Sequence, residues 1–235
     1  MSWIWYLCGI IAGYFIGCIN TGAIIARIKG FDIRDKGTGN AGASNALVTM
    51  GTTAGVLTAW GDIMKAFIPV FLLKWYIPVP SDCRHLAVVV GISIVAGHMF
   101  PFWMEFRGGK GFASLLGLTL GLNWRLFLIA FVILVLALFI TRYIALATII
   151  CALVLPICWY VLSHDLYELL MLLLLGVFMI VKHIENIHRI ADGTEIKFGS
   201  HKGKTAESAE AVPAQTDPAP AETESAVQDG TDTDA

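Results

Sequence analysis

The sequence predicts an all-α, polytopic integral membrane protein with about seven transmembrane helices, its N-terminus outside and its C-terminus in the cytoplasm. Hydrophobic residues make up 57% of the 235 residues and charged residues only 14%, with a mean hydropathy of +0.72. A soluble domain needs a more polar composition to solvate its surface. Apolar runs that can span about 30 Å of hydrocarbon recur along the chain, and basic residues gather in alternate connectors.

Seven apolar segments are predicted as helices, at residues 3–28, 52–76, 85–103, 112–122, 124–140, 143–162 and 166–181. The first has no charged n-region and no small-residue cleavage site, so we expect it to remain as the first helix. The fourth is too short to span about 30 Å alone.

The basic residues favour counting that short segment as a crossing. Seven crossings place most Lys and Arg residues in inner connectors, whereas six would place Lys182, Arg189 and Lys197 opposite the first two basic loops. Seven crossings therefore fit better. They gather three polar stretches, residues 31–51, 105–111 and 182–197, on the cytoplasmic face, where they could share a site.

Composition divides the chain into a membrane domain, residues 1–200, and a tail, residues 201–235. Eight of the eighteen acidic residues but only two of the sixteen basic residues lie after residue 200, so residues 1–200 carry a net charge of +4. The tail has almost no large apolar residue, which predicts a disordered, acidic, cytoplasmic segment without a catalytic role. The five cysteines show no disulfide framework or zinc spacing, and no metal site is expected. His164 and Asp165 are interpreted as a plain outer loop.

The glycine turn Gly108-Gly109-Lys110-Gly111 is the first candidate binding element. Glycine allows close backbone approach to an anion, and Lys110 adds a mobile positive charge, so a phosphate is the expected ligand. The alternative is a flexible connector between helices. Because Lys110 is followed by Gly111 and not by Ser or Thr, the turn does not indicate a nucleotide triphosphatase.

The second candidate is the glycine-rich loop at residues 31–51. Residues 37–42 match G-x-G-x-x-G, but a membrane helix precedes them where a dinucleotide fold needs a strand, so we reject that interpretation. The loop carries hydroxyl, amide and cationic groups that suit a phosphate, from Thr38, Gly39, Asn40, Asn45 and Arg34. Alternatively, its Asn and Gly residues only form turns.

The third candidate contains His183 and Asn186, which would share one face of a helix because they are three residues apart. His183 could act as a general base or bind a phosphate, with Asn186 orienting it. The alternative is a solvated basic helix end at the membrane surface.

Ionisable groups also occur inside apolar segments. Asp62 and Lys65 are three apart and could neutralise each other, and His98 lies near the cytoplasmic end of the third predicted helix. Such groups are expensive at membrane depth. We expect the pair to lock helix packing and His98 to support the site.

These blocks resemble the bacterial membrane acyl-phosphate:glycerol-3-phosphate acyltransferases, over most of residues 1–197. The matching motifs are Asp32-Ile33-Arg34, the run from Gly37 to Asn45, Gly97-His98 with Phe100-Pro101, Gly108-Gly109-Lys110-Gly111, and His183 with Glu185-Asn186-Ile187 and Gly193-Thr194-Glu195. The resemblance implies seven transmembrane helices and a cytoplasmic-side active site in the bacterial inner membrane.

The implied reaction moves a fatty acyl group from acyl phosphate to the 1-hydroxyl of glycerol 3-phosphate, giving lysophosphatidic acid, without cofactor, metal or nucleic acid. By the same resemblance, Gly108 to Gly111 would cradle the glycerol phosphate and the Thr38 loop would supply hydroxyl and amide contacts. His183 and Asn186 would hold the reacting groups, and Glu195 would maintain structure. The oligomeric state does not follow from the resemblance.

The chain departs from the family pattern at several positions, where it has Thr38 for Ser, Ser44 for Thr, Met99 for Asn and Val48 for Arg. Without that arginine, either Arg34 or Lys36 takes over its phosphate contact, or the acceptor or the activity has changed. Two other functions stay open. One is a transporter of a phosphate-bearing solute, which predicts broken helices at corresponding places in two halves. The other is a catalytically silent scaffold in a lipid-synthesis complex.

Overall fold

A computed structural model describes residues 2–199, and every regular element in that range is helical. The predicted tail lies outside the described residues. The α-helices are α1 (Ser2–Gly17), α2 (Thr21–Ile28), α3 (Ala43–Met50), α4 (Thr52–Trp75), α5 (Leu86–Met99), α6 (Phe112–Leu122), α7 (Trp124–Thr141), α8 (Ile144–Ser163), α9 (Leu166–Val181) and α10 (Ile184–Ala191). Short 3₁₀ turns occur at Ile33–Asp35, Ser81–Cys83 and Phe102–Met104.

Five helical segments are long and apolar enough to cross a membrane: Ser2–Ile28, Thr52–Trp75, Ser81–Met104, Trp124–Thr141 and Ile144–Ser163. The pair α9 and α10 would make a sixth if it counts as one span, bent by 51°. An all-helical membrane fold is therefore confirmed. The predicted helices at residues 112–122 and 166–181 have the observed bounds, and the other predicted helices after residue 50 end within a few residues of the observed ones.

The prediction of one continuous helix at residues 3–28 was wrong, because the chain breaks between α1 and α2. Backbone groups at membrane depth must find partners inside the protein. Lys65 Nζ donates to the carbonyl oxygens of Gly17 (3.2 Å) and Ile19 (2.7 Å), and Trp103 Nε1 donates to that of Cys18 (2.7 Å). The side chain of Asn20 caps α2 by accepting from the N–H of Ala23. Side chains from two other segments thus supply hydrogen bonds to the backbone carbonyl groups at the break.

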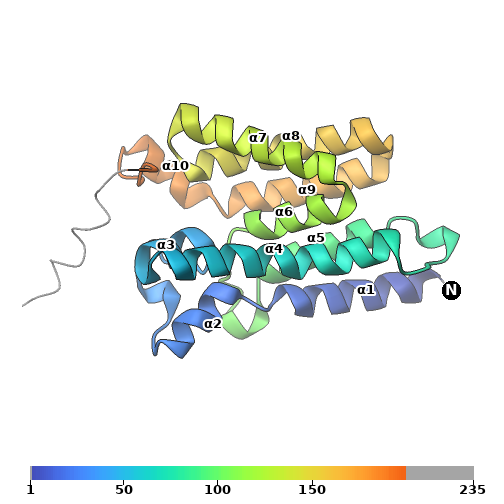
Figure 1. The fold of residues 1–235 in the computed structure, drawn as a ribbon, viewed down its shortest axis with the longest axis horizontal. Helices are drawn as coiled ribbons and strands as arrows, with labels where there is room; N and C mark the ends of the chain where they lie inside the picture. The colour runs from blue at the N-terminus through green and yellow to red at the C-terminus, as the bar shows by residue number, and fades with distance from the viewer. Residues whose placement is uncertain (1, 200–235) are drawn as a thin grey trace, which may run out of the picture. The chain divides into compact units, whose positions relative to one another are not determined.

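Small residues bring the helices into close contact. A Cβ atom at Gly13 or Gly17 would collide with backbone carbonyls of α5, and one at Gly117 or Gly121 would collide with α4. Glycines spaced by four residues on one face are a common way for membrane helices to approach closely. The pairs α1–α5 and α4–α6 accordingly lie side by side, while α7, α8 and α9 pack together (Figure 1).

Helix α6 has eleven residues, which gives it a length of about 17 Å. It cannot cross the hydrocarbon layer alone, yet most of its side chains are buried against neighbouring helices.

The polar loops gather at one end of the helices. Helices α3 and α10 both lie at the left end of Figure 1, whereas the N-terminal end of α1 lies at the right. Sequence patterns predicted no helix within residues 31–51, but α3 forms there, packs against α4 and buries Asn45 and Ala46.

Candidate active site

The glycine turn between α5 and α6 is tightly packed and is not a flexible connector. The N–H groups of Gly108 and Gly109 donate to the carbonyl oxygens of Met99 (3.2 Å) and His98 (3.1 Å). A Cβ atom at Gly108 would collide with the carbonyl oxygen of His98, and one at Gly109 would collide with the imidazole of His98. Glycine is therefore required at both positions. Their N–H groups are already used within the protein, and a phosphate contact by these two glycines stays a prediction.

The next two N–H groups are available. Within residues 2–199, the backbone N–H groups of Lys110 and Gly111 donate no hydrogen bond. Gly111 has φ of +89° and is the residue before α6, where the free N–H groups of a helix N-terminus attract anions. The hydroxyl of Ser114, in the first turn of α6, is buried without a partner among the described residues. We use the name anion cradle for the N–H groups of Lys110 and Gly111 together with the N-terminus of α6.

Lys110 connects this cradle to α10. Its Nζ contacts Oδ1 of Asn186, whose Nδ2 donates to Oε1 of Glu195 (2.6 Å). Oε2 of Glu195 accepts from Nε of Arg189 (2.7 Å). Burial lowers the pKa of Lys110 to about 8, because the ammonium loses hydration. The structure thus brings Lys110, Asn186 and Glu195 together, and adds Arg189, which the sequence patterns did not single out.

His183 lies at the bend between α9 and α10, as the N-cap residue of α10. Its side chain is 2% exposed. Nδ1 lies 2.7 Å from the carbonyl oxygen of Met179, which can only accept, so Nδ1 carries the proton. Nε2 then presents its lone pair to Oγ1 of Thr148, at 2.9 Å. His183 and Asn186 are both buried, and the expectation that they share one face stays a prediction.

Asn45 organises the loop before α3. Its buried side chain donates to the carbonyl oxygens of Ile33 (2.9 Å) and Lys36 (3.0 Å) and accepts from the N–H of Thr38 (2.8 Å). Asn45 therefore holds the loop in shape. Among the described residues the Thr38 hydroxyl makes no hydrogen bond, so it is free for a substrate.

Arg34 joins this loop to the segment before the glycine turn. Its Nε and Nη2 contact the carboxylate of Asp32, and its Nη1 donates to the carbonyl oxygen of Met104 (2.8 Å). The Arg34 guanidinium lowers the pKa of Asp32. These contacts use three of the five N–H donors of the guanidinium, and a phosphate contact by Arg34 stays a prediction.

Two other loop positions have local roles. Asn40 Oδ1 accepts from the N–H of Gly42 (2.9 Å), and Gly39 has φ of +70°, a conformation that favours glycine. Val48, at the position where the family pattern has arginine, lies on α3 with its side chain 43% exposed.

The predicted Asp62–Lys65 pair is present and extends to His98. Nζ of Lys65 lies 2.8 Å from Oδ1 of Asp62 and 2.9 Å from Nδ1 of His98. The other edge of the His98 ring faces Gly109. Since Lys65 also binds the carbonyls at the α1–α2 break, this buried cluster connects the break to the glycine turn. That arrangement fits the supporting role expected for all three residues.

Direct contacts therefore connect the three polar stretches in series: Arg34 reaches the segment before the glycine turn, and Lys110 reaches α10. The family model described as "Glycerol-3-phosphate acyltransferase" matches residues 7–193, which includes every candidate residue except Glu195.

The chain belongs to the glycerol-3-phosphate acyltransferase family. A glycerol-3-phosphate acyltransferase of Trichlorobacter lovleyi is 37% identical over 189 residues, covering 80% of this chain and 95% of that protein. A glycerol-3-phosphate acyltransferase of Rippkaea orientalis is 38% identical over 218 residues, covering 88% of this chain and 99% of that protein. The resemblance drawn from the sequence motifs is confirmed.

Solved structures of the family have the same fold. The crystal structure of PlsY (YgiH), an integral membrane glycerol 3-phosphate acyltransferase, in its glycerol 3-phosphate form, matches with a TM-score of 0.76 and 32% identity, over 87% of this chain and 98% of that chain. The lysophosphatidic acid form matches with a TM-score of 0.74 and 31% identity. The family assignment thus rests on sequence and fold together.

Two further residues of this family member were not found from the sequence, Thr148 and Ser114. Thr148 lies within an apolar run, where nothing in the pattern indicates its contact with His183. Ser114 could have been noticed, because a hydroxyl in the first turn of a helix that follows a glycine-lysine turn suits an anion site.

Proposed function

We propose that this protein transfers a fatty acyl group from acyl phosphate to the 1-hydroxyl of glycerol 3-phosphate and releases lysophosphatidic acid. The observation that carries the proposal is the cradle of Lys110, Gly111 and the N-terminus of α6 in a member of this family. It combines the ammonium of Lys110, which Asn186 holds in place, with free N–H groups. Such a site suits a phosphate monoester.

The phosphate of the acceptor would lie at this cradle, with the ammonium of Lys110 as its counter-charge. Oδ1 of Asn186 holds that ammonium beside α10. The free hydroxyl of Thr38 supplies a further donor from the α3 loop. Binding in one orientation is a large part of the rate enhancement when two substrates must meet.

The acceptor hydroxyl oxygen then forms a bond to the acyl carbon, and the bond from that carbon to the phosphate oxygen breaks. Phosphate leaves with the electron pair, so no acyl-enzyme is needed. Cationic and N–H groups stabilise the charge that develops on oxygen. The hydroxyl proton goes to a base, and Nε2 of His183 is an unprotonated candidate. Thr148 can free it by donating to the carbonyl oxygen of Ala145 (2.8 Å).

The assay that tests this proposal uses the purified full chain in lipid with glycerol 3-phosphate and one of two donors. Acyl phosphate should yield lysophosphatidic acid and inorganic phosphate in equal amounts, and acyl-CoA should not replace it. Product formation from acyl-CoA alone would overturn the donor assignment. Absence of product with either donor would overturn the acyltransferase proposal.

Complementation separates an active enzyme from a silent scaffold. A bacterial strain that lacks its own glycerol-3-phosphate acyltransferase should grow when it expresses the wild-type chain and should grow more slowly with Lys110→Ala. Equal growth with both would reject the site. No growth with the wild type, despite normal membrane expression, would favour the scaffold.

For topology we propose seven crossings, with the N-terminus outside and the cradle on the cytoplasmic side of the bacterial inner membrane. The bias of basic residues supports this orientation. The count includes α6 as a crossing, because most of its residues are buried against neighbouring helices.

Two cysteine substitutions at opposite ends test this orientation in a Cys8→Ser background. In intact cells with a permeable outer membrane, an impermeant maleimide should label Asp82→Cys and should not label Lys29→Cys. Both positions are exposed. The reverse labelling would overturn the orientation.

A further inference from the structure

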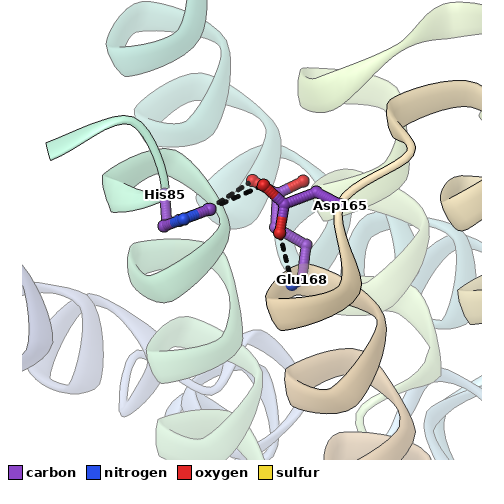
Figure 2. A group of neighbouring side chains, drawn as sticks. All are labelled: His85, Asp165 and Glu168. Carbon is purple, nitrogen blue, oxygen red and sulfur yellow. Dashed lines mark hydrogen bonds and ion pairs between the residues drawn. The ribbon is translucent and has the colours of Figure 1, made fainter. Parts of the chain in front are cut away.

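A second polar cluster lies at the end of the helices away from the candidate active site. His85 immediately precedes α5, Asp165 is the N-cap of α9, and Glu168 lies in the first turn of α9. Figure 2 shows the imidazole of His85 facing both carboxylates. His85 Nδ1 lies 3.2 Å from Oε1 of Glu168 and 3.6 Å from Oδ2 of Asp165. All three atoms lie within 4.8 Å of one another.

The remaining carboxylate oxygens are held by other groups. Oδ1 of Asp165 accepts from the N–H groups of Tyr167 (3.0 Å) and Glu168 (3.2 Å). Oε2 of Glu168 accepts from Nε1 of Trp159 (2.7 Å). Each carboxylate is therefore oriented so that its second oxygen faces His85. Outer hydrogen bonds of this kind orient the ligands of metal sites.

Nδ1 of His85 can donate only one hydrogen bond, whereas two carboxylate oxygens face it. Glu168 is buried and the other two residues are half-buried, and the Arg84 guanidinium near Asp165 is largely exposed, so the negative charge here is compensated only in part, which is costly. A divalent cation would neutralise both carboxylates at once and bind all three facing atoms. The spacing suits this arrangement, because ligands about 2.1 Å from a tetrahedral zinc ion lie about 3.4 Å apart.

We propose that His85, Asp165 and Glu168 bind a divalent transition-metal ion of the Zn²⁺ type. An imidazole nitrogen with two carboxylate oxygens favours such an ion over Ca²⁺ or Mg²⁺, which prefer oxygen ligands alone. A water molecule would complete the coordination. A surface pocket of about 320 Å³ adjoins the His85 ring and provides access; it is lined by Tyr6, His85, Val89, Tyr167 and Met171.

The Arg84 side chain competes with a metal ion for His85 and Asp165. Its Nε donates to Nε2 of His85 (3.0 Å), and its Nη2 lies 3.5 Å from Oδ2 of Asp165. Coordination through Nδ1 requires the His85 proton on Nε2, so Arg84 must move away. Its side chain is 66% exposed and can do so. Removing this guanidinium should therefore strengthen metal binding.

The bound ion would fasten the start of α5 to the start of α9. Helices α5 and α9 already contact each other directly, and the ion would reinforce that contact at the start of both helices. The role is thus structural, and it differs from the sequence-based expectation of no metal site. No pattern could reveal it, since 80 residues separate His85 from Asp165. The inference does not depend on the proposed acyl transfer.

The test is a titration of the chelator-treated full chain in detergent with Zn²⁺ alone, followed by calorimetry, and with Co²⁺, followed by visible absorption. Glu168→Gln and Asp165→Asn remove the charges but keep acceptors for Trp159 and for the α9 cap, so both should fold. We expect one Zn²⁺ per wild-type chain, and affinity at least about tenfold weaker in each variant. His164→Ala, an exposed neighbour, is the matched control and should bind as the wild type does.

Melting temperatures give a second readout. Zn²⁺ should raise the melting temperature of the wild type and of His164→Ala but not that of Glu168→Gln, because binding to the folded state stabilises it. Arg84→Ala should bind Zn²⁺ more tightly than the wild type. Absence of stoichiometric Zn²⁺ binding by the wild type, or equal binding by a folded Glu168→Gln chain, would overturn the proposal.

Discussion

Lys110 and Asn186 are 76 residues apart in the chain, yet Nζ of Lys110 contacts the amide oxygen of Asn186. Asn186 in turn is held by Glu195. The cation of the anion cradle is therefore positioned by α10 before any substrate arrives. A substrate phosphate would find the ammonium already oriented, which reduces the entropy lost on binding.

The first prediction concerns this pair. Asn186→Ala should weaken glycerol 3-phosphate binding, because Lys110 loses its orienting oxygen. Combining it with Lys110→Ala should cost little more than Lys110→Ala alone, with a coupling energy of about 1 kcal/mol or more. Values of kcat/KM for the two single variants and the double variant measure this coupling. Additive losses would show that Asn186 acts independently of Lys110.

The second prediction is a pH dependence above neutrality. Burial lowers the pKa of Lys110 to about 8, so its ammonium is present below that pH and lost above it. The substrate phosphate is already a dianion at pH 7, since its second pKa is about 6. Therefore kcat/KM for glycerol 3-phosphate should fall as pH rises through about 8, by up to tenfold per unit.

The control for the pH profile is Lys110→Arg. Arginine stays protonated throughout this range, so a Lys110→Arg enzyme that retains activity should not show the fall near pH 8. The same fall in both proteins would assign it to another group.

The third prediction tests the buried cluster beneath the glycine turn. Lys65→Met should reduce the free energy of unfolding by about 3–5 kcal/mol, because it leaves Asp62 buried without its counter-charge. The carbonyls of Gly17 and Ile19 lose their donor as well. Thermal unfolding in detergent measures the change.

The matched variant is Lys65→Met with Asp62→Leu, which removes both charges. It should be more stable than Lys65→Met alone, because no unpaired carboxylate remains. If the double variant is the less stable of the two, Asp62 has another stabilising partner and the ion-pair account is wrong.

The fourth prediction concerns the free hydroxyl of Thr38. Thr38→Val keeps the shape of the side chain and should lower kcat/KM by about 2- to 10-fold, the usual cost of one neutral hydrogen bond. Thr38→Ser keeps the hydroxyl and is the control, with activity near that of the wild type. Equal activity of Thr38→Val and Thr38→Ser would remove Thr38 from the site.

Hydropathy predicted the long helices well because burial in lipid depends mainly on local composition. The helix break at residues 18–20 was missed because it depends on contacts with distant residues and not on local composition. It is stabilised by Lys65 and Trp103, which are distant in the chain. The Asp62–Lys65 pair was found because its spacing on one helix is local, whereas the contact of Lys65 with His98 depends on how α4 and α5 pack.

In the candidate site, too, the sequence predicted local features but not those that depend on contacts between distant residues. Motifs identified Lys110, Asn186 and the Thr38 loop, but not which of their groups are free. Packing uses the N–H groups of Gly108 and Gly109, and loop structure uses the side chains of Asn45 and Arg34. Such assignments need three-dimensional contacts, because a polar group is available to a substrate only if the fold leaves it unpaired.

We expect Lys110 to bind the phosphate of glycerol 3-phosphate, and steady-state kinetics of Lys110→Ala against Lys29→Ala test this most directly. Lys29 is an exposed lysine in another basic loop. A lost charge-assisted contact should lower kcat/KM for glycerol 3-phosphate about 10- to 100-fold in Lys110→Ala. Lys29→Ala should remain near the wild type. Equal kcat/KM values for the two variants would contradict the account.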